Sequence, residues 1–90
     1  MNDLSNYYVE NNKNKELIDF YKQHLKNDTN NFQNLADLNY SISELYYNIN
    51  DFKNAKKHLV TSRENYLKFD AGQLMLKDID RMLNDTKYNL

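Results

Sequence analysis

Residues 45–59, with the sequence LYYNINDFKNAKKHL, contain the break that decides the fold. Before the break, apolar residues recur at spacings of three and four, which places them on one face of a helix. They are Leu35, Leu38, Ile42, Leu45 and Ile49. After the break the same spacing restarts in a new phase with Phe52, Ala55, Leu59, Ser62, Tyr66 and Phe69. Asn50 tolerates the left-handed conformation that ends helices, and the Asp51 carboxylate can cap the next helix. The sequence therefore predicts an antiparallel helical hairpin with a tight turn at 48–51.

Composition favours helices throughout the chain. The 90 residues include no Pro and a single Gly, Gly72, and β-branched residues are few and scattered. We therefore expect an all-α fold of four to five antiparallel helices in one small domain, residues 1–90. A domain of this size buries only about 60 to 65 % of the surface that its unfolded chain exposes. Because the chain has no Cys, the apolar core must stabilise it without disulfides or thiolate metal sites.

Further helices are expected on the N-terminal side of the hairpin. Residues 1–28 predict a degenerate helix pair: a short helix ending near Glu10, then a second one from about Asn14 to Asn27. The first carries Leu4, Tyr7 and Tyr8. The first hairpin helix should begin near Asn30, because an Asn cap followed by Gln33 is typical of a helix start.

Beyond the hairpin, Asp70 followed by Gln73 predicts the start of a closing helix, residues 70–84. The single Gly leaves an alternative, in which the second hairpin helix and the closing helix are one helix bent at Gly72. Residues 85–90 are expected to be a frayed tail.

Residues 36–69 resemble a tetratricopeptide repeat, a 34-residue helix-turn-helix unit. The matching positions are Tyr46 in the first helix, the turn Asn50-Asp51-Phe52, and the small and large residues Ala55, Leu59 and Ser62. The departures are Asn39 for the usual Trp, Ser43 for the first-helix Gly, Asn50 for the turn Gly, and Leu67 for the Pro near the end. The resemblance implies a tetratricopeptide-like array, with the closing helix covering one end of the repeat.

In this family the first helix of each repeat builds much of the inner surface, where peptide ligands often lie. The resemblance implies a partner-binding face made of Asp37, Tyr40, Glu44, Tyr47 and Asn48. Tyr supplies rigid, amphipathic contact area, which suits recognition. Tyr40 and Tyr47 have an equal alternative role, packing against a neighbouring helix, and the sequence leaves both open.

No pattern in the chain indicates catalysis or a cofactor. A Gly-rich phosphate loop, a nucleophile elbow and an HExxH pattern are all absent. His24 and His58 fall on different predicted helices, so a metal site is not expected. Asp78 and Asp80 point to different sides of a helix, which argues against a paired-carboxylate site. We expect a protein that is not an enzyme and needs neither cofactor nor metal.

Charges of both signs alternate along the chain, giving a formal net charge of -1. The small cluster Lys53, Lys56 and Lys57 has acidic neighbours, so a solvated helix face is favoured over nucleic-acid binding. No stretch approaches the roughly 20 apolar residues of a membrane span. The sequence therefore predicts a cytoplasmic protein that binds neither nucleic acid nor membrane.

These observations favour a non-enzymatic protein–protein interaction module that binds a protein or peptide through its Tyr-bearing face. The alternative is a small regulatory inhibitor or antagonist, encoded by a mobile element or phage, that occludes a target protein. Since about three repeats are usually needed for an independent core, one repeat predicts a leftover apolar surface. Either a homodimer or a partner protein is expected to cover it. An oligomeric building block without other ligands stays open as well.

Overall fold

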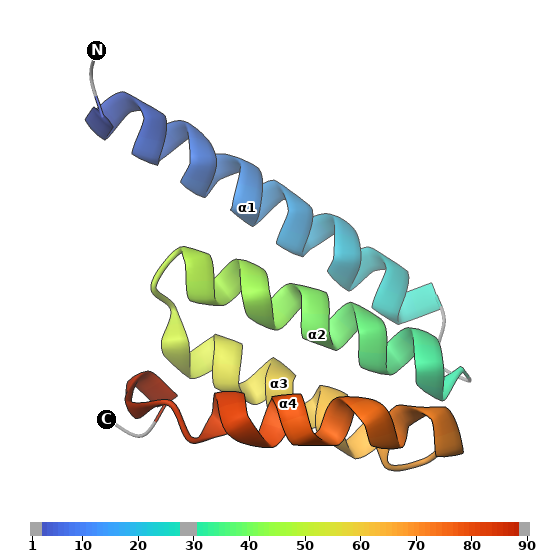
Figure 1. The fold of residues 1–90 in the computed structure, drawn as a ribbon. Coiled ribbons are helices and arrows are strands. Elements are labelled where there is room, and N and C mark those ends of the chain that lie inside the picture. Colours follow the sequence, from blue (N-terminus) through green and yellow to red (C-terminus); the bar gives the residue numbers. More distant parts are fainter. Residues whose placement is uncertain (1–2, 28–30, 89–90) are drawn as a thin grey trace.

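The computed structural model describes residues 3–27 and 31–88, with side chains from residue 13 onward, and these residues form α-helices and short 3₁₀ turns (Figure 1). The elements are α1 (Asp3–Asn27), α2 (Phe32–Asn48), α3 (Phe52–Tyr66), the 3₁₀ turn η1 (Asp70–Gly72), α4 (Gln73–Leu83) and the 3₁₀ turn η2 (Thr86–Tyr88). No strand occurs in these ranges. The all-α prediction is confirmed.

The turn between α2 and α3 forms as the sequence predicts. Asn50 has φ 65°, the left-handed conformation expected at a helix end. Asp51 caps α3, because its Oδ1 accepts a hydrogen bond from the Asn54 backbone N–H at 3.3 Å. The Asp51 N–H in turn donates to the Tyr46 carbonyl at 2.9 Å. These hydrogen bonds satisfy backbone groups at the end of α2 and the start of α3 within a short turn. α3 therefore folds back along α2 (Figure 1).

The start of α2 lies one residue later than expected. The cap is Asn31, whose backbone is extended and whose side chain accepts from the Asn34 N–H at 3.1 Å. The expected cap, Asn30, lies outside the described residues, and Gln33 is not at the position that a capping box requires. Two adjacent Asn residues offer the same capping chemistry, so the sequence did not distinguish them.

The core stripe predicted for α2 is only partly correct. Ile42 is fully buried, but the other four members of that stripe are half-buried. Ala36, Asn39 and Ser43 are buried instead. The reason is that α1 covers one side of α2 while α3 lies along another (Figure 1), so two contact faces replace the single expected one. On α3 the expected stripe is confirmed, with Ala55, Leu59, Ser62 and Tyr66 buried and Phe52 and Phe69 half-buried.

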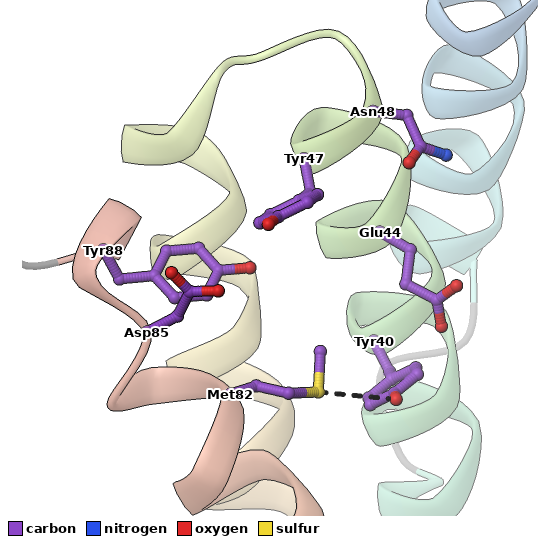
Figure 2. A pocket seen from close by; sticks show the side chains of 7 residues that line it. All are labelled: Tyr40, Glu44, Tyr47, Asn48, Met82, Asp85 and Tyr88. Carbon is purple, nitrogen blue, oxygen red and sulfur yellow. Dashed lines mark hydrogen bonds between the residues drawn. The ribbon is translucent and has the colours of Figure 1, made fainter.

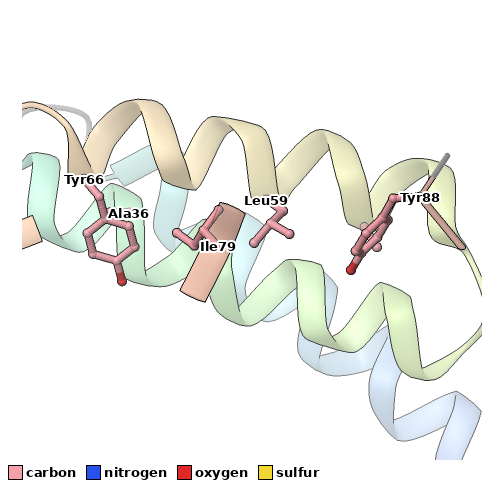
Figure 3. Close-up of a cluster of buried hydrophobic side chains, with 6 residues drawn as sticks. Ala36, Leu59, Tyr66, Ile79 and Tyr88 are labelled. Atoms are coloured by element: carbon pink, nitrogen blue, oxygen red, sulfur yellow. The ribbon is translucent and has the colours of Figure 1, made fainter. Parts of the chain in front are cut away.

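One apolar cluster joins α2, α3, α4 and η2 (Figure 3). Its buried members are Ala36, Ala55, Leu59, Tyr66, Ile79 and Tyr88. Buried polar groups are satisfied within it: the Ser62 hydroxyl donates to the Ala36 carbonyl at 2.8 Å. No fully buried side-chain nitrogen or oxygen among the described residues lacks a partner, which avoids the usual cost of burying polar atoms.

The N-terminal segment is one helix rather than the expected pair. α1 runs without a break from Asp3 to Asn27. The polar stretch around Asn14 that suggested two helices contains neither Gly nor Pro, and Asn costs only about 0.7 kcal/mol or less inside a helix. Ile18 is the buried residue through which the described part of α1 anchors on the rest of the fold.

The α3–α4 junction settles the alternative concerning Gly72 in favour of two helices. α3 ends at Tyr66, and η1 precedes α4. A Cβ atom on Gly72 would lie 2.1 Å from the Tyr66 carbonyl oxygen, so Gly is needed here for close approach of two backbones. A helix does start at Asp70, as expected, but as the 3₁₀ turn η1, and no side chain caps η1 or α4.

The predicted frayed tail is wrong for residues 85–88, whereas residues 89–90 lie outside the described part of the chain. Tyr88 is only 7 % exposed and belongs to the core. Asp85 Oδ1 accepts from the Lys87 N–H at 3.0 Å, which closes η2. Lys56 Nζ donates to the Tyr88 carbonyl at 3.2 Å and ties η2 to α3. Packing of the Tyr88 ring in the core therefore holds residues 85–88 in a defined conformation.

Leu59→Ala should lower the free energy of unfolding by about 2 to 5 kcal/mol, because a fully buried large side chain leaves a cavity. Urea denaturation measures the loss. Val60→Ala, at the exposed neighbouring position, is the matched control and should change stability by less than about 0.5 kcal/mol. Equal effects of the two substitutions would contradict the orientation of α3.

Gly72→Ala should destabilise the fold by about 1 to 3 kcal/mol, because the added methyl group meets a backbone carbonyl that cannot move alone. Thermal unfolding followed by circular dichroism is the measurement, with the exposed Gln73→Ala as control. In an ordinary helix Gly→Ala would raise stability, so an increased melting temperature would show that the two backbones do not approach closely.

Candidate functional site

A pocket of about 390 Å³ opens between the second half of α2 and the C-terminal segment (Figure 2). α2 contributes Tyr40, Glu44, Tyr47 and Asn48, and Met82, Asp85 and Tyr88 come from α4, the following residues and η2. The α2 residues are three and four apart, which places them on one face of the helix. Four of the five residues that the sequence singled out for partner binding thus line one pocket.

Tyr40 and Tyr47 of α2 both line the pocket and pack against neighbouring elements. The Tyr40 hydroxyl donates to Met82 Sδ at 3.6 Å. The Tyr47 ring lies 5.1 Å from the Phe52 ring, edge to face, and 5.9 Å from the Tyr88 ring. Aromatic pairs at such distances stabilise packing. These contacts fix the positions of the pocket walls.

The electrostatic character of the pocket is acidic. Its lining contains two carboxylates, Glu44 and Asp85, and no Lys, Arg or His. Burial raises the pKa of Tyr40, and the negative charges of Glu44 and Asp78 raise it further. Burial likewise raises the pKa of Tyr88, with smaller contributions from Tyr47, Asp85, Tyr40 and Glu44. Glu44 therefore lies close enough to act on both Tyr40 and Tyr88.

Asp37, the fifth predicted residue, lies outside this pocket. It accepts a hydrogen bond from the Tyr66 hydroxyl, linking α2 to the end of α3. Burial, together with this bond to Asp37, raises the pKa of Tyr66 well above its usual range. Asp37 lines a separate hollow beside Phe20 and His24 of α1. The structure therefore gives Asp37 a packing role that helical spacing could not reveal.

Asp85 and Tyr88 were missed as lining residues because sequence reasoning treated residues 85–90 as a frayed tail. Met82 falls within the apolar stripe expected for the closing helix, but nothing local indicates that it faces α2. Tyr88 offered one usable signal, a large aromatic side chain shortly after a helix end, where it can pack back on the core.

A second polar cluster lies where α1, α2 and α3 meet. His58 Nδ1 lies 2.9 Å from Asn39 Oδ1, and the His58 ring stacks on Tyr46 at 5.5 Å between centroids. Lys22 of α1 donates from Nζ to the Tyr46 hydroxyl at 2.6 Å. Burial lowers the pKa of His58, and the positive charges of Lys22 and Lys57 lower it further. The cluster holds three helices together and favours a neutral imidazole.

The two histidines of the chain are not brought together. His24 packs its ring against Phe20 on α1 at 4.6 Å, whereas His58 belongs to the cluster above. Within the described residues, no three or more His, Cys, Asp or Glu side chains are grouped so that they could hold a metal ion.

Two of the other charged groups that the sequence raised have structural partners. Lys56, one of the three clustered lysines, bonds the Tyr88 carbonyl. Asp80 pairs with Arg63 across the α3–α4 surface, with 2.6 Å between Oδ1 and Nε. Among the described helices, none is both long enough and apolar enough to cross a membrane.

Comparison of this chain with protein-family models, with curated proteins and with solved structures gives no match. Function must therefore be inferred from the geometry of the site.

The lowered pKa of His58 has a defined effect on stability. Unfolded His binds a proton near pH 6.5, whereas folded His58 resists protonation until a lower pH. The unfolded state thus binds more protons below about pH 6.5, and the free energy of unfolding should fall as the pH falls through that value. Urea denaturation at a series of pH values measures this slope.

His58→Gln should flatten this part of the profile, whatever its effect on stability at neutral pH. His24→Gln, at an exposed position of α1, retains His58 and should keep the wild-type slope. An unchanged slope in His58→Gln would show that other groups cause the pH dependence.

Proposed function

We propose that this chain is a small, non-enzymatic interaction module that binds a segment of another protein. The binding site is the pocket between α2 and the C-terminal segment. The observation that carries the proposal is this pocket itself, because it combines three tyrosines with polar groups at its mouth.

The size and lining of the pocket suit side chains of a protein partner. Its volume, about 390 Å³, is at the lower end of the range of ligand pockets, roughly 300 to 1,000 Å³. Tyr residues anchor recognition surfaces because they bring large contact areas at low entropic cost. Glu44 and Asn48 are exposed beside them and supply polar groups for orientation.

The pattern of burial in the α2–α3 hairpin supports a tetratricopeptide-like assignment of residues 36–69. The positions that this family fills with small residues, here Ser43, Ala55 and Ser62, are buried. Leu59, at its large apolar position, is fully buried as well. In this proposal α1 and α4 flank one repeat, and the first helix of that repeat presents the partner-binding face. The cytoplasmic location expected from the sequence is part of the same proposal.

The lining also supports a binding role over a catalytic one. It includes no Ser, Cys, Lys or His, so the pocket offers no nucleophile activated by a neighbouring base of the usual kind. Large apolar side chains that are exposed, such as Leu17 and Phe20 of α1 and Leu74 of α4, lie outside the pocket. Association of two copies through them would leave the pocket open to a partner.

Selection of a random displayed-peptide library on the immobilised protein tests the proposal. We expect peptides whose affinity falls at least about tenfold on Glu44→Arg, because the new side chain fills and recharges the pocket mouth. Glu64→Arg makes the same substitution at an exposed position of α3 and should leave affinity unchanged. Failure to select any peptide, or equal binding to both variants, would contradict a binding site at this pocket.

A further inference from the structure

The Tyr88 hydroxyl is a polar group directed into the pocket from a side chain that is otherwise in the core. Tyr88 is 7 % exposed, and Figure 2 shows its oxygen pointing between Tyr47 and Met82. Within the described residues, the hydrogen bonds of Tyr88 use its backbone: its N–H donates to the Asp85 carbonyl, and its carbonyl accepts from Lys56. The hydroxyl is therefore available to a ligand in the pocket.

The charged groups around this hydroxyl determine which charge a ligand in the pocket should carry. Glu44 on one wall and Asp85 on the other are both close enough to act on Tyr88. The nearby lysines, Lys56 and Lys87, line a neighbouring hollow that shares only Tyr88 with this pocket. An acidic ligand would be repelled, and a purely apolar one would cover the hydroxyl without giving it a partner. A cationic group that carries hydrogen-bond donors avoids both problems, because it is attracted by the carboxylates and can bond the hydroxyl.

The aromatic side chains that line the pocket also favour a positively charged ligand. Ring faces attract cations within about 6 Å of the centroid. Lys87 Nζ already lies 5.1 Å from the Tyr47 centroid and 5.5 Å from that of Phe52. Within the pocket, the half-buried rings of Tyr40 and Tyr47 offer further aromatic surface.

We propose that the pocket binds an arginine side chain of the partner segment, an inference that rests on the function proposed above. The aliphatic stem lies along Met82 and Tyr40. The guanidinium group lies between Glu44 and Asp85 and donates a hydrogen bond to the Tyr88 hydroxyl. Arginine suits this site better than lysine, because its planar group stacks on aromatic rings, directs five donors outward and is more weakly hydrated.

Titration of the isotope-labelled protein with a blocked Ala-Arg-Ala tripeptide, followed by NMR, tests the inference. We expect chemical-shift changes centred on Tyr40, Glu44, Tyr47 and Tyr88. The same peptide with citrulline in place of Arg keeps the shape and removes the charge, and should bind at least about tenfold more weakly. A Lys peptide that binds as tightly as the Arg peptide would overturn the assignment to arginine.

Two substitutions identify the groups responsible. Glu44→Gln should weaken the Arg peptide at least about threefold, whereas Glu64→Gln, its matched control, should not. Tyr88→Phe keeps the ring in the core and removes only the hydroxyl, so it should weaken Arg binding while the protein stays folded. Equal binding of the Arg peptide to wild type and both pocket variants would overturn the inference.

The peptide selection separates this inference from the proposed function. Peptides selected at the pocket should contain Arg. If they bind in a Glu44→Arg-sensitive manner but lack a basic residue, the binding site stands and the arginine assignment fails. If neither selected peptides nor the Arg tripeptide bind, both fail.

Discussion

The close approach of α2 and α3 is the interaction on which the rest of the structure depends. Toward the end of the hairpin away from the turn, the Ser62 hydroxyl donates to the Ala36 carbonyl at 2.8 Å, so a side chain of α3 reaches the backbone of α2. Only small residues permit this contact, and Ala55 lies buried along the same seam. Leu59 and Ile79 then fill the space where α4 covers the hairpin. With this packing fixed, the orientation of α2 is fixed too.

The orientation of α2 connects the core to the pocket. The helix contacts α1 on one side and α3 on another, and its Tyr-bearing face is directed to the C-terminal segment (Figures 1 and 2). Tyr88 belongs to both regions, since its ring lies in the core while its hydroxyl points into the pocket. The pocket therefore exists only when the chain end is folded, so the stability of η2 determines whether the pocket forms.

Local signals in the sequence were enough for the hairpin, and the family resemblance together with helical spacing singled out four residues of the pocket. Asn50 and Asp51 determine their turn through their own backbone and side-chain chemistry, and helical spacing aligns the Tyr face. Tertiary contacts decided the rest. The role of Gly72 depends on the Tyr66 carbonyl, and the order of the tail depends on the place of Tyr88 in the core. The split expected in α1 was wrong, because weak helix formers such as Asn do not reliably end a helix. The single stripe expected on α2 was only partly correct, because this helix is covered on two faces.

The central claim is that α2, α3, α4 and η2 close one core within a single chain and so leave the pocket open to a partner. Sedimentation over a wide concentration range, with helicity measured in parallel, tests this most directly. We expect helicity that does not change on dilution, including at concentrations where the protein is monomeric. Loss of helix as a dimer dissociates would contradict the claim, because a second copy would then be completing the core.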